Sequence, residues 1–144
     1  MSTISEIKLR LLEASTPFTL VKGATALAQV KDRPDAVLPV AYVVATKEIS
    51  AENMRATGRT MQRTERDIMI VIVCEDLGDS DGDTVQDPLE ELKTFVRGKL
   101  LGFVPSDTAG EPLTHVGGEV IEAASGCVWF ADTFSAPTYL QETI

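Results

Sequence analysis

The residues whose types and spacing come nearest to a chemical site form an aspartate-rich stretch in the middle of the chain. Acidic residues occupy positions 1, 3, 5, 9 and 12 of the twelve-residue window from Asp79 to Glu90, which is the spacing of a calcium-binding loop. The candidate ligands for Ca²⁺ or Mg²⁺ are Asp79, Asp81 and Asp83. Position 6, where such a loop needs glycine, holds Thr84. The alternative is a solvated acidic loop that leads into a helix N-terminus, where negative charge is favourable.

The sequence contains no motif typical of other catalytic or cofactor-binding sites. A zinc site needs clustered cysteine and histidine, but the chain has one histidine, His115, and two cysteines far apart in sequence. His115 has no serine in a G-x-S-x-G motif to activate, and Cys74 lies in an apolar run that would bury its thiol. The Gly98-Lys99 pair lacks the earlier glycine of a phosphate-binding loop. We therefore expect no catalytic residues, no enzymatic activity, and no cofactor other than a divalent cation in the acidic stretch.

Length and charge exclude further classes of function. The 144 residues suit one domain, residues 1–144, and 13 basic against 22 acidic side chains give a net charge of −9. This charge repels phosphates, which argues against direct nucleic-acid binding. The longest apolar run, residues 68–74, is far shorter than the roughly 20 residues that cross a bilayer, and the first thirty residues do not have the pattern of a secretory signal. We expect no membrane partner and a cytoplasmic location during synthesis.

A small set of helices and strands must position these residues. Near the start, a capping box from Thr3 to Glu6 predicts the beginning of a helix, and apolar residues follow at helical spacing. Residues 18–21 read as a short extended piece, and residues 24–30 as a short helix that ends before Pro34.

The middle of the chain predicts two strands joined by a long connection. Residues 37–46 and 62–74 are rich in β-branched residues, and 47–61 would link them as a hairpin. Thirteen residues at about 3.3 Å each would span about 43 Å, whereas a compact domain of this length is about 37 Å across. The polar half of the second strand, 63–67, should therefore project from the body, so that the hairpin forms an arm with 47–61 as its long loop.

The last part of the chain predicts one helix and one hairpin. Asp87 as N-cap and Pro88 at the first helical position predict a helix that Gly102 ends in left-handed conformation. Residues 115–123 and 127–134 then read as paired strands joined at a short turn.

Taken together, the elements predict an α+β fold. Helices pack on a four-stranded mixed sheet in the order α, short α, β, β, α, β, β, with a protruding hairpin arm and a C-terminal tail at residues 135–144. We expect a right-handed crossover if the second and third strands lie parallel.

The arm carries the densest basic group of the chain. Its arginines are Arg55, Arg59, Arg63 and Arg66. One interpretation is a solvated hairpin whose arginines pair with Glu52 and Glu65, which contributes little to stability. The other is a cationic arm that docks on an acidic surface of a neighbouring copy or of another assembly component. On the second interpretation, Arg59, Arg63 and Arg66 are the candidate interface residues.

The order of these segments resembles the tail terminator proteins of long-tailed bacteriophages. The likeness is greatest to the small terminators of Mu-like phages, which are related in architecture to the lambda minor tail protein U. It rests on segments spread over most of the chain, namely 38–44, 58–67, 87–92, 100–105, 116–118, 128–134 and 139–140. Each segment alone is weakly specific, so the likeness depends on their order and spacing. The aspartate-rich stretch is more acidic than the family pattern.

The resemblance implies a structural virion protein without catalytic residues. Such proteins form a ring, usually a hexamer, that ends polymerisation of the tail tube and provides the surface for head-tail joining. The implied partners are other copies of the chain, the tail tube protein, a neck or head-completion protein, and a sheath protein if the tail is contractile. DNA would only pass through the lumen. The implied location is the host cytoplasm during assembly and then the head-proximal end of the virion tail.

A different module remains as the alternative function. The chain could be a non-enzymatic neck or adaptor protein that binds other proteins as a monomer or dimer, either with or without dependence on a divalent ion.

Overall fold

A mixed five-stranded sheet forms the framework of the protein. The computed structural model describes residues 2–75 and 83–143, without the side chains of 83–87. Its strands lie in the order β1-β2-β3-β5-β4; β1 and β2 are parallel and the other neighbours are antiparallel. The elements, in chain order, are α1 (Thr3–Leu11), β1 (Leu20–Gly23), α2 (Ala24–Ala28), β2 (Val40–Ser50), β3 (Met61–Glu75), α3 (Asp83–Leu100), β4 (Thr114–Ala124) and β5 (Cys127–Gln141).

The expected α+β class and mixed sheet are confirmed, but the strand count of four is wrong. The additional strand is β1, which the sequence predicted only as an extended piece. Its residues from Leu20 to Gly23 pair in parallel with Val40 to Val43. A four-residue strand is too short to display an alternating pattern, and its partner lies about twenty residues further along the chain.

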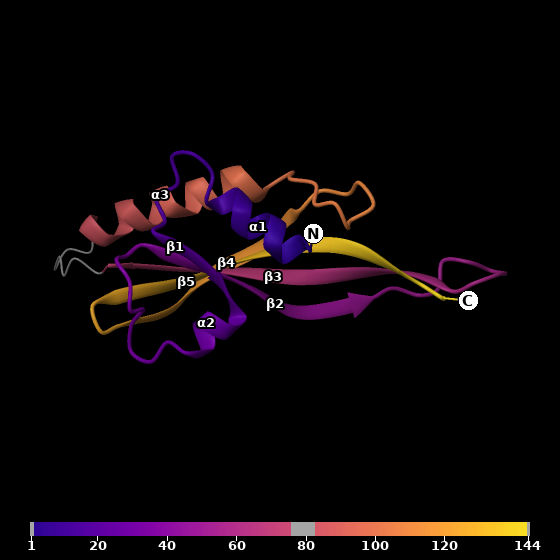
Figure 1. The fold of residues 1–144 in the computed structure, drawn as a ribbon, viewed down its shortest axis with the longest axis horizontal. Helices are drawn as coiled ribbons and strands as arrows, with labels where there is room; N and C mark the ends of the chain where they lie inside the picture. The colour runs from indigo at the N-terminus through magenta and orange to yellow at the C-terminus, as the bar shows by residue number, and fades with distance from the viewer. Residues whose placement is uncertain (1, 76–82, 144) are drawn as a thin grey trace.

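Helices cover the two faces of the sheet unequally. Helices α1 and α3 lie on one face, and the short α2 lies on the other (Figure 1). The core under α1 and α3 includes Ile7, Leu11, Val96 and Leu100, packed on inward-facing residues of β3 and β5 such as Phe134. On the opposite face, the smaller cluster around Tyr42, Val71 and Val73 packs with residues of α2. The larger core therefore holds the long helix and the sheet together.

The N-cap of helix α1 lies one residue earlier than the sequence predicted. Its N-cap is Ser2, whose hydroxyl accepts a hydrogen bond from the Ser5 amide at 3.2 Å. Thr3 is instead buried, and its hydroxyl donates to Asp107. The Thr3–Glu6 capping box is therefore wrong, because a tertiary partner takes the threonine side chain.

Helix α3 also begins before the predicted residue. It starts at Asp83, so Asp87 is not its N-cap and Pro88 lies inside the helix. Proline at this position lacks the backbone N–H that would otherwise donate to the carbonyl one turn earlier in the helix. The predicted end is confirmed: Gly102 follows the helix with φ 82°. No described helix is both long and apolar enough to cross a membrane.

The protruding arm is built from three strands rather than two. Strand β2 pairs with β3 out to Ser50 and Thr64, so the predicted hairpin is present but residues 47–50, which were predicted as part of its loop, belong to the strand. Strand β5 also pairs with β3 along its whole length, out to Met61 and Gln141. The segment 135–144, assigned to a tail from sequence, thus contributes residues 135–141 to the third strand. In Figure 1 these strands extend well beyond the helices and taper to a loop.

The packing of α3 yields a test at two adjacent leucines. Leu100 is fully buried in the core, whereas Leu101 is 59% exposed. Leu100→Ala should lower the free energy of unfolding by about 2–5 kcal/mol because it leaves a cavity. Leu101→Ala should change it by less than about 0.5 kcal/mol. Urea unfolding followed by circular dichroism measures both, and equal effects would contradict the position of α3 on the sheet.

Candidate functional site

The tip of the arm is an ordered loop, residues 51–60. The Met54 amide donates to the Met61 carbonyl at 2.7 Å and closes the loop. The side-chain oxygen of Asn53 accepts from the amides of Arg55 at 3.2 Å and Met61 at 3.0 Å. Gly58 has φ 86°, a conformation that side chains other than glycine rarely adopt. The tip thus presents its side chains from a defined backbone.

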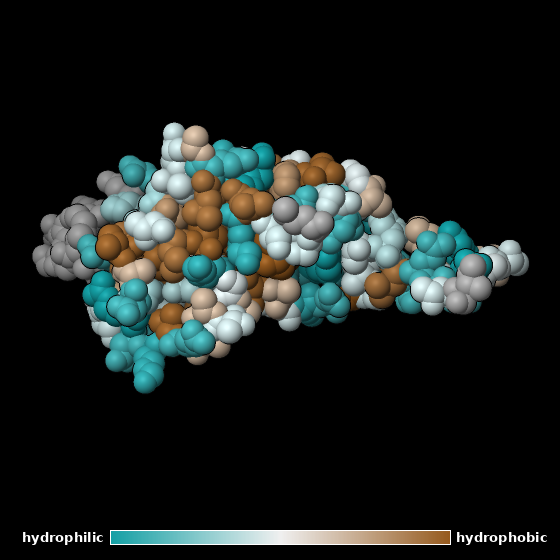
Figure 2. Space-filling view, in the orientation of Figure 1, coloured by the Kyte–Doolittle hydropathy of each residue, from teal (hydrophilic) through white to brown (hydrophobic). Residues whose placement is uncertain are grey.

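Two side chains at the tip are available for contact with another molecule. Met54 is 58% exposed. Arg59 is exposed and has no hydrogen bond or ion pair with the described part of the chain. Arg55 contacts the Met61 sulfur at 3.4 Å. Figure 2 shows the narrow arm as mainly hydrophilic or neutral at its end, while hydrophobic residues gather on the wider body.

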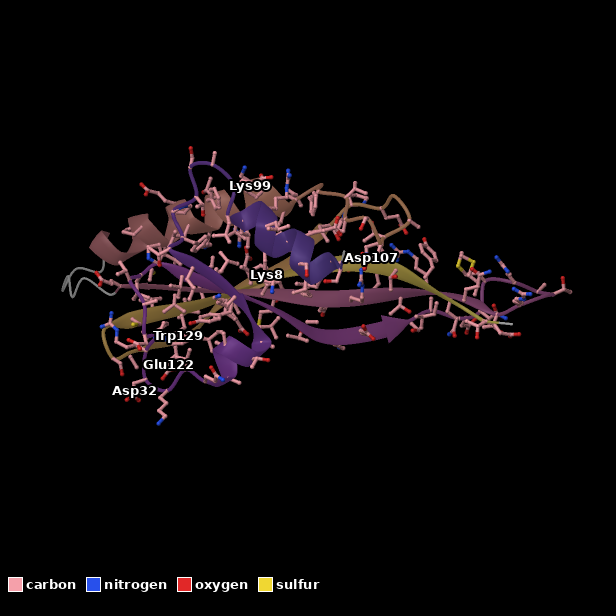
Figure 3. All side chains as sticks on the ribbon, viewed as in Figure 1. Lys8, Asp32, Lys99, Asp107, Glu122 and Trp129 are labelled. Atoms are coloured by element: carbon pink, nitrogen blue, oxygen red, sulfur yellow. The ribbon has the colours of Figure 1, made fainter. Side chains whose placement is uncertain are left out.

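The base of the arm is fixed by Arg66. Its guanidinium donates to the Thr3 hydroxyl at 3.0 Å and to the Ala136 carbonyl at 3.2 Å. It also reaches the Asp107 carboxylate at 3.4 Å. Asp107 lies where the loop after α3 meets β5 (Figure 3). One arginine therefore connects α1, β3, β5 and this loop.

Arg63 makes a second connection between the arm and the same loop. It forms ion pairs with Glu65 and with Glu111, the latter at 3.0 Å. The Tyr139 hydroxyl on β5 also donates to Glu111. The predicted pairing of Arg63 with Glu65 is present, whereas Glu52 has no ion pair among the described residues. Of the three predicted interface arginines, the structure brings Arg63 and Arg66 onto the subunit's own body and leaves Arg59 at the tip.

These contacts shift the acid-base behaviour of the two loop carboxylates. Burial alone would raise the pKa of Asp107, but hydrogen bonds from Thr3 and Arg66 outweigh it and lower the pKa below its ordinary value of 3.8. The hydrogen bond from Tyr139, followed by that from Arg63, lowers the pKa of Glu111. Both carboxylates therefore stay ionised at neutral pH and keep the loop attached to the arm.

A buried charged cluster, which sequence reasoning missed, lies under α3. Asp132 on β5 is fully buried, and Arg97 on α3 donates two hydrogen bonds of 3.0 Å to its carboxylate. His115 on β4 contacts the same carboxylate at 2.7 Å. The hydrogen bond with Asp132 raises the pKa of Arg97. The only sequence signal was a single acid at an inward-facing position within the apolar stretch 128–134.

This cluster leaves little room for chemistry. Both Asp132 oxygens are taken by Arg97, and one of them also contacts His115, so the carboxylate is held as a structural ion pair. Gly118 on β4 lies directly against it: a Cβ there would meet the Phe130 ring at 2.7 Å and the Asp132 carboxylate at 2.9 Å. Glycine at this position therefore allows β4 to approach the buried pair.

The predicted metal ligands belong to a part of the chain that the structure does not describe in full. Asp79 and Asp81 lie outside the described residues, and so does the side chain of Asp83. Among the residues that the structure does describe, no group of three or more His, Cys, Asp or Glu side chains is arranged to hold a metal ion.

Comparison with known proteins identifies the family of this chain. The family model of the phage tail terminator protein matches residues 2–143. The chain belongs to the phage tail terminator family. It is therefore a structural protein of a phage-type tail, and the resemblance drawn from its sequence segments is confirmed.

A solved structure shares the fold of this terminator. It is a chain from the "Virion of native gene transfer agent (GTA) particle", with 15% sequence identity and a TM-score of 0.54. The match covers 97% of this chain and 100% of that chain. At this identity the likeness concerns the fold alone. No curated protein matches the sequence.

The close approach at Gly118 gives a test of the buried cluster. Gly118→Ala should destabilise the terminator by about 1–3 kcal/mol, because the rigid ring of Phe130 and the doubly anchored Asp132 must both move. The neighbouring Gly117 has open space around its Cβ position. Gly117→Ala should therefore be neutral or slightly stabilising. If chemical denaturation gives the two variants the same stability, β4 does not lie against the cluster as described.

The lowered pKa of Asp107 predicts a dependence of stability on pH. Its ionised form is favoured in the folded state, so its contribution is present above the unfolded pKa near 3.8 and is lost as the pH falls through the lower folded pKa. Asp107→Asn should lower the melting temperature at pH 7, and the difference from wild type should shrink below about pH 4. Asp35, an exposed acid without a hydrogen bond or ion pair in the described residues, supplies the control Asp35→Asn. A difference independent of pH would contradict the assigned role of the carboxylate.

Proposed function

We propose that this terminator forms a closed ring on the finished end of the tail tube. The ring stops tube polymerisation and provides the surface to which the filled head joins. The observation that carries the proposal is the three-stranded arm, which extends beyond the helices and ends in a loop with exposed Met54 and Arg59 (Figure 1). The family to which the chain belongs gives the role, and the arm supplies a means of assembly.

Ring formation requires two different contact surfaces on each subunit. A ring closes through head-to-tail contacts, so every copy needs two different patches that complement each other. A projecting arm is suited to be one patch, because Met54 at its tip is exposed and Arg59 makes no hydrogen bond or ion pair with the described part of the chain. The net charge of −9 leaves acidic surface for the other patch. Acidic residues that face the lumen would also let DNA pass without sticking.

The three candidate interface arginines have different roles in the proposed contact. We propose that Arg59 contacts the next subunit or the tube protein directly. Arg63 and Arg66 have side chains that are 35% and 17% exposed and already bind the body. Their part in the interface is to fix the direction of the arm, and Arg63 retains enough exposure to touch a neighbour as well.

The proposed partners follow from the position at the end of the tube. They are other copies of this chain, most simply six in all, the tail tube protein, and a neck or head-completion protein, with a sheath protein in a contractile tail. Assembly takes place in the host cytoplasm, and the ring then resides at the head-proximal end of the virion tail. We propose that assembly needs no cofactor, with a divalent cation near Asp79, Asp81 and Asp83 as the one ion to test.

The proposal predicts a concentration-dependent large species. Solution mass should be measured over a range of protein concentrations, with and without Mg²⁺ or Ca²⁺, and any large species imaged by negative stain. We expect a closed ring with a central hole, either in solution or after addition of purified tail tubes, whose ends it should cap. Tubes polymerised with the protein should be shorter than tubes polymerised without it.

A protein that stays monomeric at every concentration and leaves tube ends bare would contradict the ring. That result would favour the neck or adaptor role. A change in melting temperature with Ca²⁺ or Mg²⁺ would then identify the ion-dependent form, since a ligand at 100 times its dissociation constant stabilises by about 2.7 kcal/mol.

A further inference from the structure

A shallow groove lies on the sheet face opposite α1 and α3, beyond the part that α2 covers. It has a volume of about 350 Å³. Strands β3, β5 and β4 line it, through Asp67, Met69, Val116, Glu119, Ala131 and Thr133. Met69 and Ala131 form an apolar floor, and Val116 at the edge is 57% exposed. No described helix or loop closes this groove.

The rim of the groove carries two acidic side chains, Asp67 and Glu119. Neither Asp67 nor Glu119 has a side-chain hydrogen bond or ion pair with the described part of the chain. Lys47 lies opposite Asp67 in the β2–β3 ladder but makes no ion pair with it there. The groove thus combines two free carboxylates with an apolar floor, and it suits a partner that offers a cation beside an apolar side chain.

The arm tip offers this combination. Arg59 is a free cation, and Met54 is an exposed, flexible apolar side chain on the same loop. Arg55 on this loop adds a second positive charge against the single acid Glu52. The charges and apolar groups of the tip therefore complement those of the groove.

The tip cannot reach the groove of its own subunit. Asp67 lies six positions along β3 from Met61, which is at the base of the tip, and this is about 20 Å of extended strand. The β3–β5 pairing runs without a register shift through this region, so the arm cannot fold back. An arm that fills the groove must therefore come from another copy.

We propose that the arm tip of one subunit docks in the β3–β5–β4 groove of the next subunit. Arg59 pairs with Glu119 and Asp67 at the rim, and Met54 packs on the floor beside Met69. The contact joins two different surfaces, so it is head-to-tail and can close into a ring. The inference rests on the proposed ring and names the two surfaces that build it.

A charge-swap experiment tests the pairing. Arg59→Glu and Glu119→Arg should each raise at least tenfold the protein concentration needed for half-maximal assembly, because each places like charges together. The double variant should return to within about threefold of wild type, since the new pair is again opposite in charge. Both side chains are exposed and make no hydrogen bond or ion pair with the described part of the chain, so circular dichroism and melting temperature should be unchanged. Assembly is followed by sedimentation, or by co-sedimentation with tail tubes if rings form only there.

The matched control is Glu91→Arg. Glu91 is also exposed but lies on α3, on the opposite face of the sheet from the groove. The single variant Glu91→Arg should assemble like wild type. Combined with Arg59→Glu, it should not restore assembly. Rescue by Glu91→Arg as well as by Glu119→Arg would mean that net charge governs assembly, and would overturn the specific contact.

Cross-linking separates this inference from the ring itself. Wild-type Cys74 and Cys127 are buried, so introduced surface thiols dominate the chemistry. A chain carrying Arg59→Cys and Glu119→Cys should form a disulfide-linked ladder between subunits under mild oxidation, whereas Arg59→Cys with Glu91→Cys should not. Rings without this ladder, unaffected by the charge swaps, would overturn the docking and leave the proposed function standing. A ladder without closed rings would support the docking and contradict the ring.

Discussion

The uninterrupted pairing of β3 with β5 is the constraint on which the other features depend. Fifteen residue pairs run from Met61 and Gln141 at the arm to Glu75 and Cys127 at the far end. At one end the two strands carry the inward-facing apolar residues on which α1 and α3 pack. At the other end the same strands continue without helices and form the arm. Body and arm are thus two halves of one ladder. The packing of the core therefore determines the position of the arm.

The two halves are stabilised by different interactions because their widths differ. The body buries large side chains such as Ile70 and Phe134 between sheet and helices, so apolar burial dominates there. The arm is too narrow for such burial. Where the two meet, the contacts are polar: Arg66 and Asp107 join α1, the sheet and the loop after α3. A guanidinium suits this place because its several donors can satisfy acceptors on several elements at once.

Sequence reasoning succeeded where a long pattern or a specific cap was present, and failed where tertiary contacts decided the outcome. The extent of β3 and its projection followed from the length of the apolar and polar runs. Strand β1 and the pairing of residues 135–141 could not be predicted, because each depends on a partner distant in sequence. The cap moved from Thr3 to Ser2 because Asp107, about a hundred residues away, takes the threonine hydroxyl. The Asp132 cluster was missed because its members come from three separate elements.

The continuous β3–β5 ladder has a geometric consequence for assembly. The ladder fixes the angle between the direction of the arm and the plane of the groove, and in a head-to-tail contact that angle sets the rotation from one subunit to the next. In the proposed ring, the number of copies and the diameter of the opening would then depend on the twist of the sheet and on the bulge at Thr46 in β2. The size of the proposed channel would thus be set by the backbone hydrogen bonding of the sheet.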